Sequence, residues 1–349
     1  MRILFVDGTK DYSPGRLGDQ PTGGIATSLT LIPRYLASKG HDVWVKSVHD
    51  KDEKVAGVNF LSRLAPAPTV DFVVLNRNLV TENVVSQVLA QGATPIWWLH
   101  DMVDFRYLQD GAFKKIEHIV SLSQYCMDTY SEFYSIQQNK FKIIPNGIDP
   151  EVWFPGDYAD RDPNLFVFAS APIKGYAPLQ FVMHNLRRAL PKLDFRIYSS
   201  QGLHGLMDSS EFGAWLKGMA ANGATVSPPT PQKDLADVFR KAWCLLMPND
   251  YPEMNSNLLL QAWACGLPVV TSPVGSNAEY IEHGITGMLT QRVPHDRFAW
   301  WADYARQVMA LVTSKEVHKQ ISAKTPSLPL TWEQVGGMWE EYLIEIKNA

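Results

Sequence analysis

Short apolar runs alternate with longer amphipathic segments through the first part of the chain. Six runs have the length of strands: 3–6, 42–48, 71–76, 95–100, 118–123 and 142–146. The segment 25–39 places Leu29, Ile32 and Leu36 at helical spacing and ends before Gly40, which predicts a helix. Because such alternation is typical of a parallel sheet covered on both faces, we expect a doubly wound α/β domain over residues 1–150.

The same alternation begins again after Pro155. Strands are expected at 165–170, 195–200, 244–248 and 268–272, and helices at about 179–189, 235–241 and 257–265. Residues 146–164 are rich in Gly, Pro and Asp and lack a sustained period, so we interpret them as a linker. The pattern thus predicts two Rossmann-like lobes, residues 1–150 and 151–330. Ligands of such sheets bind beyond the carboxyl ends of the strands, and we expect them in a cleft between the lobes.

Composition excludes several classes of protein. The 349 residues suit two domains, and 46% hydrophobic with 19% charged residues indicates a globular chain. With a net charge of -4 and no Lys/Arg cluster, binding to nucleic acid is disfavoured. Cys126, Cys244 and Cys265 are odd in number and lie in apolar segments, which argues against a disulfide framework and a zinc site. No apolar run has membrane-spanning length, so we expect a cytoplasmic protein and leave a peripheral membrane contact open.

Two stretches are candidates for ligand binding. Gly23 and Gly24 lie between a strand and a helix, where glycines let the backbone approach a ligand and the helix start favours an anion; turn chemistry alone also explains such a pair. In the second stretch, Asn255 or Ser256 can cap a helix that begins near Asn257. Its start suits a diphosphate, and Glu253 can accept hydrogen bonds from sugar hydroxyls. An acidic residue near a helix start is also favoured by the helix dipole alone.

Several motifs, in order, resemble one family of enzymes. They are GGIATSL (23–29), WLHD (98–101), SLSQYCMD (121–128), IIPNGIDPEVWFP (143–155), APIKG (171–175), the long stretch 251–289 from YPEMNSNLLLQAW to GITGML, and TWEQVGGMWEEYL (331–343). Together they resemble the retaining glycosyltransferases of family four, which have the GT-B fold and a Glu-x7-Glu motif. The resemblance covers nearly the whole chain. It implies two lobes that face an interdomain cleft, the first on the acceptor side and the second binding the nucleotide sugar, with a helix at 331–349 packing back on the first.

The resemblance also implies roles for individual residues. Glu253 matches the glutamate that contacts the transferred sugar, Lys174 the basic residue that meets the diphosphate, and His100 the histidine that reaches the sugar hydroxyls. The donor-binding set it implies is Gly23, Gly24, Met254, Asn255, Ser256, Asn257, Gln261 and Ser200. A solvated turn lysine and an ordinary strand-end histidine remain the alternatives for Lys174 and His100.

Two positions depart from the family's pattern. The second glutamate of the motif, which binds the ribose in the family, is Gln261 here. The arginine found about five residues before the lysine is absent, since residues 166–172 read FVFASAP. Glutamine still offers an acceptor and a donor to a ribose diol, but it gives up charge-assisted hydrogen bonds. We therefore expect weaker donor binding rather than lost function.

The reaction implied by the resemblance moves a sugar from a UDP- or GDP-linked donor to an acceptor hydroxyl with retention, in glycan or glycoconjugate biosynthesis. No suitable loop carries the Asp-x-Asp motif of the metal-dependent glycosyltransferases. We therefore expect a metal-independent enzyme that needs no cofactor. The acceptor stays open among a glycan, a lipid-linked glycan and a small molecule. The alternatives are a sugar-nucleotide epimerase of the same fold and a nucleotide- or glycan-binding homologue with weak catalysis.

Overall fold

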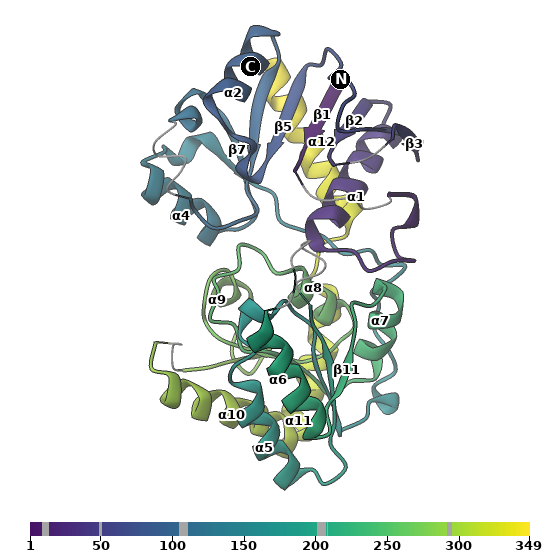
Figure 1. The fold of residues 1–349 in the computed structure, drawn as a ribbon, viewed down its shortest axis with the longest axis vertical. Coiled ribbons are helices and arrows are strands. Elements are labelled where there is room, and N and C mark those ends of the chain that lie inside the picture. The colour runs from purple at the N-terminus through teal and green to yellow at the C-terminus, as the bar shows by residue number, and fades with distance from the viewer. Residues whose placement is uncertain (9–13, 49–50, 105–110, 201–206, 208, 292–294) are drawn as a thin grey trace. The chain divides into compact units, whose positions relative to one another are not determined.

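The computed structural model describes residues 1–8, 14–48, 51–104, 111–200, 207, 209–291 and 295–349. Contacts between residues divide the chain into two compact units (Figure 1). The first comprises residues 1–17, 22–147 and 330–349, and the second comprises residues 18–21 and 148–329. Each unit is an α/β structure built on a mainly parallel sheet, which confirms the predicted fold class. The roles expected of the two lobes remain predictions.

The sheet of the first unit has the strand order β3-β4-β2-β1-β5-β6-β7-β8 among the described residues. Its strands are β1 (Arg2–Val6), β2 (Asp42–Lys46), β3 (Glu53–Val55), β4 (Val58–Leu61), β5 (Phe72–Asn76), β6 (Thr94–Trp98), β7 (His118–Ser121) and β8 (Phe141–Ile143). Only the β3–β4 pair is antiparallel within this described sheet. Strand β5 is buried along its whole length, as expected of a strand covered on both faces.

The first unit has its helices at α1 (Gly24–Ser38), α2 (Glu82–Ala90), α4 (Gln124–Tyr134) and α12 (Trp332–Asn348). Helix α12, yellow in Figure 1, packs beside the purple α1. Gly336 permits this close approach, because a Cβ there would lie 2.4 Å from Cγ of Tyr35. Trp339 of α12 is fully buried and meets Phe5 of β1 and Trp98 of β6, with ring centroids 5.9 and 5.1 Å away. The last helix therefore completes the core of the first unit.

The second unit has a parallel sheet of order β11-β10-β9-β12-β13-β14 among the described residues. Its strands are β9 (Leu165–Phe168), β10 (Asp194–Tyr198), β11 (Thr225–Ser227), β12 (Cys244–Met247), β13 (Val269–Thr271) and β14 (Met288–Leu289). Its helices are α5 (Leu179–Ala189), α6 (Ser210–Ala221), α7 (Gln232–Lys241), α8 (Asn257–Ala264), α9 (Asn277–Tyr280), α10 (Arg297–Thr313) and α11 (Lys315–Lys324). No helix among the described residues is both long and apolar enough to cross a membrane.

The segment predicted as a linker is largely part of the second unit. Trp153 is only 2% exposed and packs on Phe239 of α7. The buried Arg161 donates hydrogen bonds to the carbonyl oxygens of Ala242 (2.7 Å) and Cys265 (2.6 Å). A guanidinium that satisfies the free carbonyls at two helix ends ties this segment to the unit. Its Gly, Pro and Asp content reflects an irregular path, not independence from the core.

Candidate functional site

The loop between β12 and α8 is held in place by backbone contacts at Glu253. Glu253 and Gly275 form an isolated parallel bridge, and Ser276 N donates to the Glu253 carbonyl at 2.8 Å. Gly275 has a φ of 67°, and a Cβ there would lie 2.4 Å from Glu253 N. Glycine is therefore required where this backbone crosses so closely. The result is a fixed direction for the Glu253 side chain, which is mostly buried.

Helix α8 begins directly after this loop. Ser256 is its N-cap, and its Oγ accepts from Leu259 N at 3.5 Å. The sequence left Asn255 and Ser256 open as caps, and the structure selects Ser256. Asn255 instead donates through Nδ2 to the hydroxyl of Tyr280 at 2.6 Å. Met254 is buried, and the Asn257 side chain is half-buried at the first position of the helix.

Lys174 and Glu253 form an ion pair. The Nζ atom of Lys174 lies 2.8 Å from Oε1 and 3.0 Å from Oε2 of Glu253. The Glu253 side chain is 10% exposed and that of Lys174 is 27% exposed. Asn249 Nδ2 adds a hydrogen bond to Oε1 at 3.4 Å, and the Lys174 Nζ lies 5.8 Å from the Tyr251 ring centroid. A cation, a carboxylate and an amide thus converge before the start of α8.

Gly175 brings the two halves of this cluster together. Lys174 ends a short 3-10 turn after β9, and Gly175 follows with a φ of 94°. A Cβ at Gly175 would lie 1.6 Å from the carbonyl oxygen of Pro248, which follows β12. Since β9 and β12 are neighbours in the sheet, the chains at their carboxyl ends touch at this glycine. Only a residue without a Cβ allows that approach.

Gln261 and Ser200 lie at other places in the second unit. Gln261 is the fifth residue of α8 and its side chain is half-buried. Ser200 follows β10 and is also half-buried. Neighbouring Ser199 donates to the carbonyl of Ser170, which links the ends of β10 and β9. Ser200 thus follows the strand beside β9, and Lys174 comes after β9 itself.

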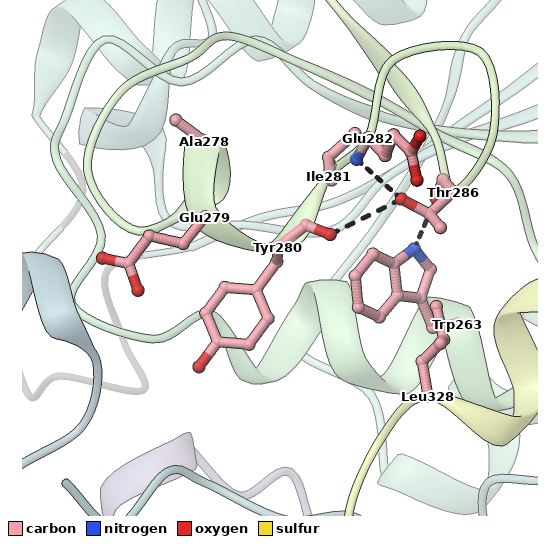
Figure 2. A pocket seen from close by; sticks show the side chains of 8 residues that line it. All are labelled: Trp263, Ala278, Glu279, Tyr280, Ile281, Glu282, Thr286 and Leu328. Carbon is pink, nitrogen blue, oxygen red and sulfur yellow. Dashed lines mark hydrogen bonds between the residues drawn. The ribbon is translucent and has the colours of Figure 1, made fainter.

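A cavity of about 510 Å³ lies beside α8 and α9 (Figure 2). Its lining consists of Trp263, Ala278, Glu279, Tyr280, Ile281, Glu282, Thr286 and Leu328. Trp263 Nε1 donates to the Thr286 carbonyl at 2.8 Å, and burial raises the pKa of Tyr280 to about 12. None of the site residues expected from the sequence lines this cavity; Asn255 reaches its wall through Tyr280.

His100 belongs to the first unit, two residues after β6. Its ring contacts Trp98 edge-on, with centroids 4.4 Å apart. Nε2 is buried and has no hydrogen-bond partner among the described residues. Burial, and then the charge of Arg77, lowers the pKa of His100 to about 3. The imidazole is therefore neutral at neutral pH, and its buried nitrogen is a polar atom without a protein partner.

Gly23 and Gly24 also belong to the first unit. Gly23 is the N-cap of α1 with a φ of −73°, and Gly24 is the first residue of the helix. The Gly23 carbonyl accepts from the Thr27 amide at 3.1 Å. A Cβ at Gly23 would meet no atom within 4 Å, so neither its φ nor packing requires glycine. An open backbone at a helix start is consistent with close approach by a ligand.

The structure thus brings together one part of the predicted set. Glu253, Lys174 and the residues from Met254 to Asn257 surround the start of α8 in the second unit. His100, Gly23 and Gly24 are placed in the first unit. Asn249 and Tyr280 were not predicted as site residues, although both form hydrogen bonds with predicted ones. Asn249 could have been predicted from its position, because it is a polar residue two positions after the buried strand β12.

Known proteins resemble this chain in sequence and in fold. Residues 164–310 match the family model described as glycosyl transferases group 1. The D-inositol 3-phosphate glycosyltransferase of Segniliparus rotundus is 26% identical over 190 residues, covering 52% of this chain and 42% of the relative. The protein of that name from Pseudarthrobacter chlorophenolicus is 30% identical over 209 residues, covering 56% of this chain and 47% of the relative. The matches thus span about half the length of these relatives.

Solved structures resemble the chain over its whole length. The sucrose-phosphate synthase of Thermosynechococcus elongatus superposes with a TM-score of 0.77 at 14% identity, covering 100% of both chains. The Anabaena protein HepE, solved in complex with UDP and glucose, gives a TM-score of 0.74 at 14% identity, covering 98% of this chain and 99% of that one. At this identity the likeness concerns the fold. Residues 164–310 thus match the glycosyl transferases group 1 model, within a chain of GT-B fold.

Proposed function

We propose that this protein is a retaining glycosyltransferase that moves a sugar from a nucleoside-diphosphate sugar to an acceptor hydroxyl. The observation that carries the proposal is the Lys174–Glu253 ion pair before the start of α8, inside the region that matches the group 1 glycosyl transferases. A cation and a helix start suit a diphosphate, and a carboxylate suits sugar hydroxyls. A donor that carries both groups would separate the ion pair and use each member.

On this proposal, the leaving group is stabilised where its charge develops. The bond between the anomeric carbon and the diphosphate oxygen breaks, and negative charge grows on that oxygen. Lys174 and amides at the start of α8 would meet this charge, a preorganised electrostatic stabilisation that needs no metal ion. The Anabaena HepE structure holds UDP, which supports a UDP-linked donor; a GDP-linked donor is the alternative that the family resemblance implies.

The acceptor oxygen would attack from the face that the diphosphate leaves. A new bond joins the anomeric carbon to that oxygen, and the proton of the acceptor hydroxyl passes to the departing phosphate oxygen. Glu253 and His100 would hold the hydroxyls of the transferred sugar. His100 suits this role because its buried Nε2 has no partner among the described residues. Gln261 and Ser200 would contact the nucleoside, and Gly23 and Gly24 would face the phosphates.

The acceptor is proposed only as a class. Residues 1–150 would carry the acceptor side, and a glycan, a lipid-linked glycan or a small molecule each offers the required hydroxyl. The relatives named D-inositol 3-phosphate glycosyltransferase make phosphorylated polyols one group to include. A cytoplasmic location, with or without a peripheral membrane contact, belongs to the same proposal.

The decisive experiment is nucleoside diphosphate release from a panel of UDP- and GDP-sugars, with and without acceptor mixtures. We expect acceptor-dependent release, retained configuration in the product, and undiminished turnover with chelator. Lys174→Met should remove turnover, whereas Lys233→Met should not, because Lys233 pairs with Asp19 on the exposed surface of the same unit. Conversion of the donor without an acceptor would support an epimerase instead. Tight donor binding without turnover would support a binding protein.

A further inference from the structure

Three strands of the first unit end in polar residues that lie side by side. Val6 of β1 pairs with Leu75 of β5, and Asn76 at the end of β5 pairs with Trp98 of β6. Asp7 therefore follows β1 beside Asn76, and Arg77 and His100 follow β5 and β6 at the same edge. Carboxyl ends of parallel strands are where ligands of such sheets bind. Arg77 and Asp7 have no part in the proposed function so far.

Arg77 spans this edge. Its Nη2 lies 3.4 Å from Oδ1 of Asp7, and its Nη1 lies 3.8 Å from Oδ2 of Asp101, next to His100. The Asp7 side chain is fully buried, and Asn76 Nδ2 donates to its Oδ2 at 3.1 Å. The guanidinium thus connects a buried anchor after β1 with the segment after β6. The planar fork of arginine presents N–H groups in fixed directions to the two carboxylates, and the compact ammonium of lysine does not reproduce that geometry.

The backbone of Arg77 is held in an uncommon conformation. Its φ is 53°, a region that glycine favours and that arginine seldom adopts. The indole Nε1 of Trp97, from β6, donates to the Arg77 carbonyl at 3.1 Å and fixes the peptide. Such conformations persist where surrounding contacts determine them, and they gather at functional sites.

The backbone after His100 is held by the Tyr130 hydroxyl, which donates to the Asp101 carbonyl at 2.9 Å. The His100 ring packs on the neutral Trp98, and the charged residues near it are Arg77, Asp101 and, behind Arg77, Asp7. Burial lowers the pKa of His100 to about 3, and the Arg77 charge acts in the same direction. The guanidinium thus acts on the Asp101 side chain, next to His100, and adds to the effect of burial on the imidazole.

We infer that Arg77 is a positioning residue of the active site: it links the Asp101 side chain, next to His100, to the buried Asp7, so that His100 meets the donor sugar. This inference rests on the proposed function, since the sugar is the partner assigned to His100. Arg77 itself contacts no substrate on this account. Removal of the Arg77 side chain should impair sugar transfer. It should leave the binding of the nucleoside diphosphate unchanged, because the second unit would hold that ligand.

The test compares Arg77→Gln with Arg2→Gln. Arg2 is a matched control, because it pairs with Asp71 at 3.5 Å across the opposite ends of the same two strands. We expect Arg77→Gln to lower kcat about 10- to 100-fold, the usual effect of misplacing a reacting group, with the Kd of the released nucleoside diphosphate unchanged. Arg2→Gln should leave both values as they are. Equal kcat values for the two variants would overturn the inference.

A pH titration separates positioning from general damage. Removing the Arg77 cation should raise the pKa of His100 from about 3 while burial still holds it below its ordinary value. In Arg77→Gln, the acid limb of the pH profile of kcat should therefore move to higher pH. In Arg2→Gln it should stay in place. It should also stay in place in Arg77→Lys, because that variant keeps the charge. Arg77→Lys should still lose part of kcat, because the ammonium does not reproduce the fixed fork geometry of the guanidinium. An unmoved acid limb in Arg77→Gln contradicts the inference.

The inference and the proposed function can fail separately. If the wild-type protein turns over no donor, NMR titration of the His100 imidazole, assigned with His100→Gln, still decides whether Arg77 acts on that ring. An unchanged titration in Arg77→Gln would overturn the inference. If Arg77→Gln fails to fold, Arg77→Gly provides the same test, because glycine adopts a positive φ without strain. Arg77→Gly with wild-type kcat and an unmoved titration would also overturn it.

Discussion

The ammonium group of Lys174 lies 2.8 Å from the carboxylate of Glu253, although 79 positions of sequence separate the two residues. Each group is thus neutralised by the other when no ligand is present. Because the Glu253 side chain is only 10% exposed, removal of Lys174 would leave a largely buried charge without its partner. The roles of the two residues are best distinguished by replacing the carboxylate of Glu253 with a neutral group of the same shape.

Glu253→Gln should impair transfer far more than nucleotide binding. The proposed partner of Glu253 is the sugar, and charge-assisted hydrogen bonds contribute about 1.5 to 3 kcal/mol, so kcat should fall about 10- to 100-fold. Calorimetry with the bare nucleoside diphosphate should give a Kd near the wild-type value. Asp19→Asn, which removes a carboxylate from an exposed ion pair of the same unit, is the control. Normal transfer by Glu253→Gln would refute the role assigned to it.

Gln261→Glu should tighten donor binding if residue 261 contacts the ribose. Four residues of rise place it about 6 Å along α8 from Asn257, within reach of a nucleoside whose phosphates lie over the helix start. A carboxylate there should gain about 1 kcal/mol, or several-fold in Kd. Gln180→Glu, on the exposed side of α5, adds the same charge elsewhere.

A donor titration of Gln261→Glu has two other informative results. Weaker binding would mean that the glutamine compensates for the arginine that the family has before the lysine, because an added carboxylate would then repel the diphosphate. An unchanged Kd would show that residue 261 does not touch the nucleotide.

Gly175→Ala should destabilise the second unit and disturb the Lys174–Glu253 pair. The added Cβ would lie 1.6 Å from the Pro248 carbonyl oxygen, so the loops after β9 and β12 must move apart. Gly284→Ala is the matched control, since Gly284 also has a positive φ of 77° but its Cβ would meet open space. That control should cost about 1 to 2 kcal/mol from backbone strain alone. Denaturant unfolding should give a larger loss for Gly175→Ala; equal losses would contradict this reading of the contact.

Acid should destabilise the second unit through His318. Its ring is fully buried, stacks 3.6 Å from the Trp243 ring, and accepts or donates hydrogen bonds at both nitrogens. Burial lowers the pKa of His318 to about 4 from its ordinary value of 6.5. The unfolded chain therefore binds a proton first as pH falls, and stability present above pH 6.5 is lost progressively towards pH 4. The linked loss is on the order of 3 kcal/mol.

Thermal unfolding between pH 7 and 4 measures this effect. His318→Gln should be less stable at pH 7, because it loses the stacking contact, but its stability should fall less steeply with acid. His184→Gln, at an exposed position of α5, should keep the wild-type slope. Parallel curves for wild type and His318→Gln would show that another group governs the acid transition.

The hydrophobic pattern of the sequence was sufficient to predict the buried strands, but it did not predict some elements at the surface. The runs at 71–76 and 165–170 contain β5 and β9, which are buried at every residue. The β3–β4 hairpin was missed because its strands are short and its turn uses Ala56 and Gly57, both with positive φ, in place of a usual turn pair. Helix α10 was also missed, although Trp300, Tyr304, Val308 and Leu311 recur at helical spacing.

The site was predictable only in part, for a related reason. The start of α8 is encoded within a few residues, so the sequence located the helix and limited its cap to Asn255 or Ser256. The contacts of Glu253 with Lys174 and of Asn255 with Tyr280 depend on which strands are neighbours in the sheet. No periodicity carries that information, because neighbours in a sheet are set by the whole topology. The family resemblance implies roles for the predicted residues. Their contacts with one another are known only from the structure.

The return of α12 to the first unit affects how the protein is made. A ribosome releases residues 1–147 first, yet Trp339 must reach Phe5 and Trp98 before that unit has its full core. Residues 148–329 form most of the second unit without interruption and can fold while translation continues. The lobe that is synthesised first is thus completed last, and its nascent β-sheet must stay free of misassembly until the final helix arrives.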